Sequence, residues 1–271
     1  MRNVRFCFIL LGIGYFYFEK SGVSVSQDDQ FLMPELEAAT HVGTLIEERR
    51  DDLFVPHSGK FEYSVPEHTA LEATIHWIGE RRWYSYHPDT KHGPYPVIML
   101  FHGAGRNGLS MIDMWRDTAD QHGLFLIALD GKDQNWPAEA IFPSILHDIL
   151  SQADEVSPID REHIFLFGHS NGARYVQNLL NRAKGPWRAA AVHAGFAVAD
   201  SAIIPENPKP LRLYLGTRDH ICLTGSARSV AYVLAANGHS VELLPIPNHT
   251  HWFYDAGPKI AEDAWTWFAR Q

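Results

Sequence analysis

The segment Phe165–Ala173 reads FLFGHSNGA and joins an apolar run to a serine that lies between two glycines. The chain continues as RYVQNLLNRA (174–183), in which apolar residues recur at helical spacing. The pattern predicts a buried strand that turns abruptly into a helix. Ser170 then lies at the bend, with Gly168 and Gly172 where larger side chains would collide. A G-x-S-x-G sequence between a strand and a helix is typical of a nucleophile elbow.

Outward from this turn, predicted strands alternate with predicted helices. The strands cover residues 72–78, 81–88, 96–105, 124–131, 163–168, 189–195, 211–219 and 241–247. The helices cover residues 110–123, 143–155, 171–183, 225–238 and 258–271. This alternation implies right-handed crossovers. We therefore predict an α/β fold with a mostly parallel, doubly wound sheet, helices on both faces, and ligand sites at the carboxyl ends of the strands.

Composition and charge limit the class of partner. The chain has 271 residues, of which 45% are hydrophobic and 20% charged, as in ordinary globular proteins. Its formal net charge is −9, whereas nucleic acids and anionic membranes are bound by basic surfaces, so we expect neither as a partner. We place one α/β domain over residues 61–271, preceded by a polar lead-in segment at 27–60 with a helical pattern at 34–50.

Residues 1–26 have the features of an export signal. A short cationic start precedes an apolar run of 13 residues, and small residues follow at Ser24 and Ser26. We expect cleavage after Ser26, a secreted or periplasmic protein, and no stable membrane association once the signal is removed. A membrane anchor is the weaker alternative, because Glu19 and Lys20 interrupt a run already shorter than the roughly 20 residues that span a bilayer.

Two cysteines are present, Cys7 in the expected signal and Cys222 in the body. A mature chain with one cysteine forms no internal disulfide. Cys222 follows RDHI without a glycine-flanked turn to present it, so we interpret it as a structural residue and not as a nucleophile.

A serine hydroxyl is a weak nucleophile unless a base takes its proton and a carboxylate orients that base. Where a nucleophile elbow is present, the acid and the histidine follow it in chain order. Asp219 ends LRLYLGTRD, directly after a predicted strand, and is our candidate for the acid. Asp200 and Asp130 also follow predicted strands, but both are more simply explained as loop residues.

The base is expected beyond the last strand, where IPNHTHWFYD supplies His249 and His251. Residues two apart on an extended segment share a face, so this pair could also bind zinc. No third ligand has a recognisable spacing, and we therefore expect no metal and no other cofactor. From these residues alone, either histidine could be the base.

Ester hydrolysis also needs hydrogen-bond donors for the oxyanion. LFHGAG (100–105) ends the strand that supplies one backbone N–H, from Ala104 or alternatively Gly103, and Asn171 after the serine supplies the other. For substrate contacts we favour Trp136, which follows a predicted strand, and then Trp252, which adjoins a candidate base. Large aromatic residues are nevertheless more often part of the core.

Several of these segments together resemble a known family. RRWYSYHP, LFHGAG, FGHSNGA, LGTRD and HTHWFYDAGPKIAEDAWTWF are similar to the secreted α/β-hydrolase esterases related to polyhydroxybutyrate depolymerases and to feruloyl and acetylxylan esterases. The resemblance covers roughly residues 75–271. It implies ester hydrolysis by a Ser-His-Asp triad through an acyl-enzyme, without a cofactor, on a small-molecule or polysaccharide-linked ester.

The resemblance also bears on two details of the site. In related esterases the catalytic histidine often precedes a run of aromatic residues, and His251 before Trp252-Phe253-Tyr254 fits that register better than His249. Depolymerase-like members usually carry a cysteine where this chain has Ala104, which favours a general carboxylesterase. An exported serine peptidase and a non-catalytic binding module on the same fold are the alternatives, since a fold does not fix its chemistry.

Overall fold

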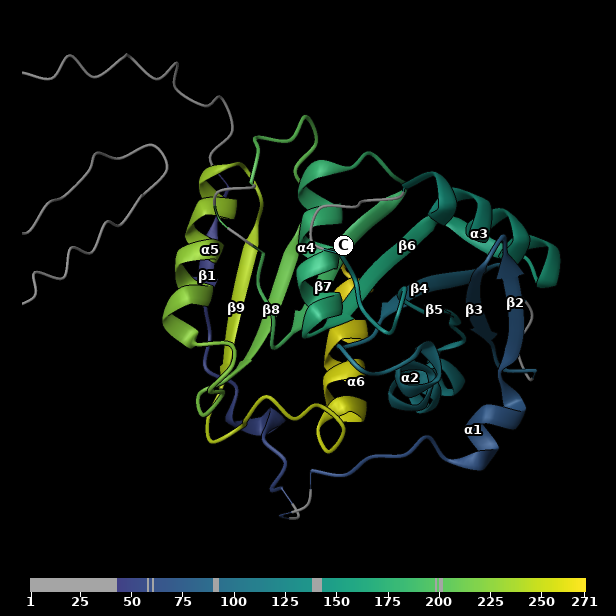
Figure 1. Cartoon of the computed structure of the whole chain (residues 1–271). Helices are drawn as coiled ribbons and strands as arrows, with labels where there is room; N and C mark the ends of the chain where they lie inside the picture. The colour runs from purple at the N-terminus through teal and green to yellow at the C-terminus, as the bar shows by residue number, and fades with distance from the viewer. Residues whose placement is uncertain are drawn as a thin grey trace, which may run out of the picture. The chain divides into compact units, whose positions relative to one another are not determined.

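The computed structural model describes the part of the chain that holds the predicted sheet (Figure 1). The described residues are 43–57, 59, 61–89, 93–137, 143–197, 199 and 202–271. The expected export signal at 1–26 and the first part of the lead-in segment, residues 27–42, lie outside them. Among the described residues, none of the helices is both long enough and apolar enough to span a lipid bilayer.

A nine-stranded sheet forms the centre of the described region, with the spatial order β1-β9-β8-β7-β6-β4-β5-β3-β2. Only the pairings of β3 with β2 and with β5 are antiparallel, and every other pairing is parallel. The strands are β1 (Leu45–Glu47), β2 (Thr74–Ile78), β3 (Arg81–Tyr86), β4 (Tyr95–Phe101), β5 (Phe125–Leu129), β6 (Ile159–His169), β7 (Trp187–His193), β8 (Leu211–Gly216) and β9 (Val241–Ile246).

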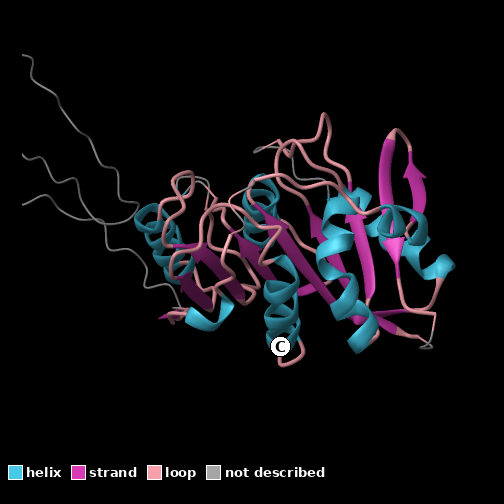
Figure 2. Cartoon of the chain, turned by 90° about the horizontal axis from the view of Figure 1, so that it is seen from below, coloured by secondary structure: helices cyan, strands magenta, loops and turns pink. Residues whose placement is uncertain are grey.

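Helices cover both faces of this sheet (Figures 1 and 2). They are α1 (Glu67–Glu72), α2 (Gly108–His122), α3 (Pro143–Val156), α4 (Asn171–Arg182), α5 (Thr224–Ala236) and α6 (Gly257–Phe268), with a 3-10 turn, η1, at Asp51–Leu53.

Strand β4 shows why both faces need cover. Its residues Val97 to Phe101 are all fully buried. Val97 and Met99 belong to the core beneath α3, α4 and α5, whereas Ile98 and Leu100 belong to the core beneath α2 and α6. Successive side chains of a strand point to opposite faces, so a run that is apolar throughout requires a helical layer on each side.

The expected fold class is confirmed: the sheet is mostly parallel and carries helices on both faces. The eight predicted strands correspond to β2–β9, and the five predicted helices to α2–α6. The expected helix at 34–50 is wrong where it can be compared, because Leu45–Glu47 forms strand β1. This segment pairs with β9, which would otherwise leave backbone groups unpaired at the sheet edge. Helix α1 was not predicted, since its six residues are too few for a helical period to show.

The register of the strands gathers the candidate residues at one edge. Phe101 pairs with Gly168, and His169 pairs with His193, so β4, β6 and β7 end side by side. Strands β8 and β9 continue this edge, with Gly216 opposite Ile246. The segments that follow these strands therefore meet at the carboxyl edge of the sheet.

Candidate active site

The backbone at Ser170 is strained, as an elbow requires. Its φ of 52° and ψ of −113° lie outside the regions that residues with a side chain ordinarily adopt. A Cβ on Gly168 would collide with the backbone of Gly172, and a Cβ on Gly172 would collide with the carbonyl of Phe101. The two glycines therefore allow the strand and helix to approach, and the serine projects between them at the amino end of α4.

Ser170, His251 and Asp219 form one hydrogen-bonded chain. Ser170 Oγ lies 2.8 Å from His251 Nε2, and His251 Nδ1 lies 2.8 Å from Asp219 Oδ2. An ionised carboxylate only accepts hydrogen bonds, so Nδ1 of the imidazole is the donor. In the neutral ring Nε2 is then the acceptor and faces the serine hydroxyl. The structure brings together the three residues that the sequence nominated for nucleophile, base and acid, and His251 is the histidine at the serine.

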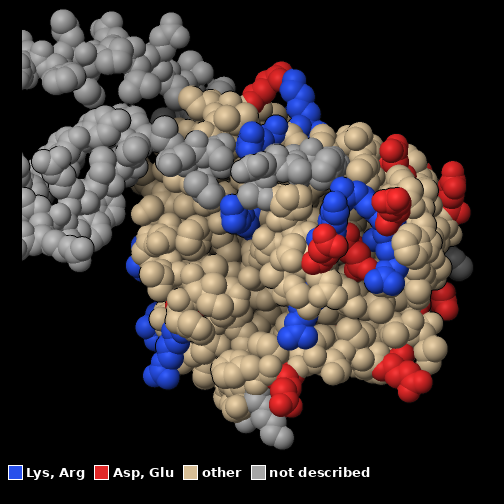
Figure 3. Space-filling view, viewed as in Figure 1, with Lys and Arg blue, Asp and Glu red and all other residues tan. Residues whose placement is uncertain are grey.

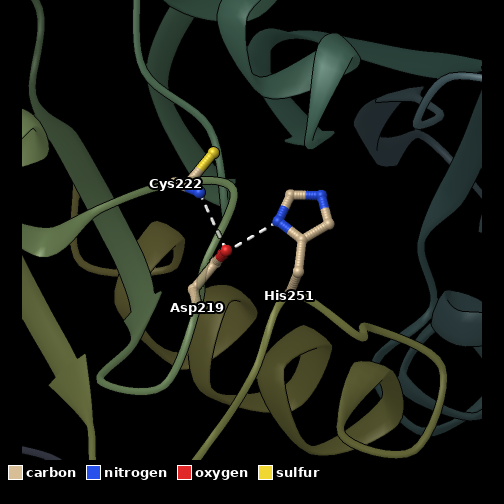
Figure 4. Close-up of side chains that lie close together, drawn as sticks. All are labelled: Asp219, Cys222 and His251. Atoms are coloured by element: carbon tan, nitrogen blue, oxygen red, sulfur yellow. Dashed lines mark hydrogen bonds and ion pairs between the residues drawn. The ribbon is translucent and has the colours of Figure 1, made fainter.

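The carboxylate of Asp219 is held from several sides (Figure 4). Its Oδ1 accepts hydrogen bonds from the backbone N–H groups of Ile221 and Cys222, both at 2.8 Å, while Oδ2 accepts from His251. Burial opposes ionisation, but the hydrogen bonds from His251 and Cys222 outweigh it and keep the pKa of Asp219 below its usual value. The group is therefore charged at neutral pH and fixes the orientation of the imidazole.

Cys222 lies close enough to Asp219 and His251 for the three to be weighed as metal ligands. Its Sγ donates to the carbonyl oxygen of Ala194 at 2.9 Å. Burial, and then the charge of Asp219, raise the pKa of this thiol to about 12, so it keeps its proton. In the structure Asp219 and His251 are hydrogen-bonded to each other and Cys222 to a backbone carbonyl, so the three side chains are engaged in contacts within the protein.

His249 belongs to a different chain of hydrogen bonds. Its Nε2 lies 2.8 Å from His193 Nε2, and His193 Nδ1 lies 3.0 Å from His169 Nδ1. All three side chains are buried. Burial lowers the pKa of His249 to about 4 and that of His169 to about 3, and holds that of His193 well below its usual value. His249 and His251 face different partners and do not share a ligand position.

The loop after β4 lies against the nucleophile. A Cβ built on Gly103 would fall 3.4 Å from the Cβ of Ser170. Within the described residues, the N–H groups of Gly103 and Ala104 donate no hydrogen bond, whereas those of Gly105 and Arg106 do. Neither oxyanion candidate on this loop is thus occupied by an acceptor from the described part of the chain, as binding of an external oxyanion requires.

His102 links this loop to the segment that follows β5. Its Nε2 accepts a hydrogen bond from the N–H of Gly131 at 2.9 Å, so Nδ1 carries the proton and donates to the carbonyl of Gly103 at 2.7 Å. Burial lowers the pKa of His102 and keeps the ring neutral. We did not predict this role from the sequence, although the His-Gly pair directly after a buried strand was a usable signal.

Asn171, the other oxyanion candidate, is the first residue of α4, where a backbone N–H has no partner inside the helix. Its side chain is engaged elsewhere, since Oδ1 accepts from the N–H of Trp136 at 2.6 Å. Trp136 itself is only 5% exposed, and its Nε1 donates to the carbonyl of His102 at 2.8 Å. The structure thus places Trp136 in the core beneath the loop after β4, where its ring has little surface to offer the substrate contact that we predicted.

The remaining candidates are Trp252, Asp130 and Asp200. Trp252 is partly exposed and lines a cavity of about 250 Å³ beside His249. Asp130 accepts from Arg82 and from the N–H of Gly108 at the start of α2, and it is not part of the hydrogen-bonded chain of Ser170. Asp200 lies outside the described residues.

Comparison with known proteins finds similar solved structures but no similar sequence. No family model matches the sequence, and no curated protein matches it. Among solved structures, an S-formylglutathione hydrolase from Agrobacterium tumefaciens matches with a TM-score of 0.61 at 13% identity, over 73% of this chain and 94% of that chain. The carboxylesterase of Bacillus cereus matches with a TM-score of 0.53 at 18% identity, over 71% of this chain and 95% of its own.

A poly(3-hydroxybutyrate) depolymerase from Bordetella parapertussis matches with a TM-score of 0.52 at 17% identity, over 77% of this chain and 99% of that chain. The chain has the α/β-hydrolase fold. At these identities the likeness establishes the fold and not the reaction. In an α/β-hydrolase, the elbow, the acid loop and the histidine loop meet at the carboxyl edge of the sheet, as the segments around Ser170, Asp219 and His251 do here.

Proposed function

We propose that the protein is a serine-dependent carboxylic ester hydrolase with Ser170 as nucleophile, His251 as base and Asp219 as the orienting acid. One observation carries this proposal: the unbroken chain from Ser170 Oγ through both nitrogens of His251 to Asp219 Oδ2, with 2.8 Å at each link. The chain starts at a strained serine on an α/β-hydrolase elbow, which is the arrangement that activates a hydroxyl for attack.

The first half of the proposed reaction forms an acyl-enzyme. Ser170 Oγ attacks the ester carbonyl carbon while its proton passes to His251 Nε2, and the charge of Asp219 stabilises the imidazolium. The carbonyl oxygen becomes an oxyanion that accepts from the N–H groups of Ala104 and Asn171. The tetrahedral intermediate then collapses, the bond to the alcohol oxygen breaks, and His251 returns the proton to the leaving alcohol.

The second half releases the acid. Water attacks the acyl group on Ser170 and gives its proton to His251, and a second tetrahedral intermediate forms in the same oxyanion site. Its collapse breaks the bond to Oγ, and His251 reprotonates the serine. Each step uses groups of this chain, so activity is expected to persist after exhaustive treatment with a chelator; a loss that zinc restores would contradict this route.

Surface charge argues against a polyanionic partner. On the face drawn in Figure 3, Lys and Arg side chains lie beside Asp and Glu side chains. The chain also carries a net charge of −9. Such a surface does not favour binding to nucleic acid, whose affinity depends on a cluster of cations.

The test of the proposed function is a panel of 4-nitrophenyl esters of rising acyl length, together with methyl ferulate, acetylated xylan and a peptide 4-nitroanilide. We expect hydrolysis of esters, and a fall of about 10⁴-fold or more in Ser170→Ala with an unchanged unfolding transition. Ester hydrolysis that survives this substitution would contradict the proposal. Cleavage of the anilide at a rate like that of the esters would favour a peptidase.

We also propose that residues 1–26 direct export and are removed. The support is the cationic and apolar pattern of that segment, followed by small residues at Ser24 and Ser26. Amino-terminal sequencing of the protein recovered outside the cytoplasm should begin at or within two residues of Gln27. Recovery of the chain with Met1 in a membrane fraction would favour an anchor.

A further inference from the structure

Arg106 lies beside the proposed active site and has no carboxylate partner among the described residues. Within the described residues, no Asp or Glu lies within ion-pair distance of its guanidinium, whereas ion pairs are formed by Arg49, Arg50, Arg82, Arg116, Arg161, Arg212 and Arg228. In a chain with net charge −9, an unpaired and half-buried guanidinium requires an explanation.

Three aromatic rings surround the Arg106 guanidinium. Its central carbon lies 4.9 Å from the ring centre of Tyr254 and 5.7 Å from those of both Tyr63 and Trp252. Tyr63 and Tyr254 are themselves stacked at 3.9 Å. A guanidinium over aromatic faces is attracted by the rings and has a fixed plane.

Most N–H donors of the Arg106 guanidinium form no hydrogen bond to a described residue. One N–H, on Nη1, donates to the carbonyl oxygen of Tyr63 at 3.1 Å. Among the described residues this is the one hydrogen bond of the side chain, and a guanidinium has five N–H donors. The hydroxyls of Tyr63 and Tyr254 are hydrogen-bonded to Asp113 and Ser110, and neither forms a hydrogen bond with Arg106. Donors of the guanidinium are therefore left to bind an anion.

Arg106 also lies between the two loops that serve Ser170. It follows the oxyanion candidates Gly103 and Ala104, and its backbone N–H donates to the carbonyl of Gly103 at 3.2 Å. Trp252, which contacts the guanidinium, directly follows His251 in the chain. A ligand that bonds to this side chain is therefore held beside the segments that contact the reacting carbonyl.

We propose that Arg106 is a specificity-determining residue that binds a carboxylate on the substrate, so that the preferred ester carries a negative charge near the scissile bond. This inference rests on the proposed function. Guanidinium and carboxylate match in planar two-point hydrogen bonding, which a fixed guanidinium plane favours. The carboxylate belongs either to the acyl part or to the alcohol part of the ester, and both place the same chemistry at Arg106.

The experiment compares matched charged and neutral esters. For the acyl part, the pair is mono-4-nitrophenyl adipate and 4-nitrophenyl hexanoate; for the alcohol part, it is 3-carboxyphenyl butyrate and phenyl butyrate. In at least one pair we expect kcat/KM to favour the charged ester. In Arg106→Gln that ratio should fall about 10- to 100-fold, mainly through KM of the charged ester, as expected for loss of a charge-assisted pair. Arg106→Lys should give an intermediate ratio.

Two controls separate recognition from other effects. Arg161→Gln removes the same charge at an exposed ion pair with Asp154, so it should leave both ratios unchanged. The unfolding midpoint of Arg106→Gln is measured alongside. If Arg106→Gln lowers the rates on charged and neutral esters equally, Arg106 only supports the loops and the inference is wrong. The inference is equally wrong if the wild-type protein favours neither charged ester.

Failure of the proposed function gives a different result. If the wild-type protein hydrolyses neither member of either pair, the hydrolase proposal fails, and adipate itself then serves as a probe by titration calorimetry. Binding that is lost in Arg106→Gln and retained in Arg161→Gln would keep the anion site; no binding to the wild-type protein would remove it.

Discussion

Two chains of hydrogen bonds run side by side at the carboxyl edge of the sheet, and they begin at neighbouring residues. Ser170 starts one, which passes through His251 to Asp219, and His169 starts the other, which passes through His193 to His249. The first joins a hydroxyl to a carboxylate, whereas the second contains imidazoles alone.

The difference shows what makes one histidine a base. The imidazole of His251 has a carboxylate on one nitrogen and a hydroxyl on the other, so proton transfer from Ser170 produces a cation beside a fixed anion. A proton added to the second chain has no carboxylate hydrogen-bonded to it, and burial lowers the pKa of His249 to about 4. A place in a hydrogen-bonded chain therefore does not by itself make a histidine a base. The charged carboxylate at the end of the chain does, because it stabilises the imidazolium.

The largest expected effect is that of His251→Ala. Without the base, the proton of Ser170 has no acceptor, and kcat on a 4-nitrophenyl ester should fall about 10⁴-fold or more, as in Ser170→Ala. The ring is partly exposed, with 17% of its side chain accessible, so the unfolding midpoint should change little. Substantial activity in this variant would contradict the assignment of the base to the first chain.

Asp219→Asn should have the next largest effect. The amide can donate to Nδ1 of His251 and so favour the tautomer that has its proton on Nε2, which cannot accept from the serine. We expect kcat to fall about 10³- to 10⁴-fold with little change in KM. A pH series is informative here, because recovery of activity at high pH would show that the tautomer is not the cause.

His249→Gln tests the second chain and should have a modest effect on rate. Glutamine keeps a polar group near His193 Nε2, so the loop that carries His251 retains a link to β7. We expect more than about a tenth of the wild-type kcat. The opposite pattern, with His249→Gln inactive and His251→Ala active, would leave a serine, histidine and aspartate mechanism in place but assign its base to the wrong histidine.

The buried imidazoles of the second chain should affect the pH dependence of stability more than the rate of hydrolysis. The folded-state pKa values of His169 and His249, about 3 and about 4, lie below the ordinary histidine value of 6.5. Between pH 6.5 and about 4 the unfolded chain therefore binds protons that the folded chain does not. The free energy of unfolding should fall as pH falls through this window, by roughly 1.4 kcal/mol per pH unit for each such histidine.

Chemical denaturation at pH 7, 6 and 5 measures this slope. His249→Gln removes one of the groups, so its slope should be shallower by about one proton. A slope that does not differ between the variant and the wild-type protein would show that His249 is not buried in its neutral form.

Much of the fold was predictable because its signals are local. The turn at Ser170 depends on a short apolar run and on two glycines within five residues, and all of these are visible in sequence. Strand β1 was not, because its pairing with β9 joins Leu45 to Val241, far away in the chain. A segment with a helical pattern became a strand since the edge of the sheet offered it hydrogen bonds.

In the site, order along the polypeptide nominated Ser170, Asp219 and a pair of histidines, and the family resemblance favoured His251. Neither signal could show the second hydrogen-bonded chain. His169, His193 and His249 come from three separate segments, and no spacing links them. Trp136 illustrates the converse difficulty: its place after a strand suggested a substrate contact, but its ring packs in the core with Phe101. The sequence shows which side chain follows a strand and not the direction in which that side chain points.

The most direct measurement of the central claim is labelling by a fluorophosphonate, followed by mass analysis of the intact protein and of its peptides. We predict one adduct per chain, on Ser170, in the wild-type protein and in His249→Gln, and at least a hundredfold slower labelling in His251→Ala. Labelling of His251→Ala at the wild-type rate, or an adduct on a residue other than Ser170, would contradict the assignment of Ser170 and His251 as nucleophile and base.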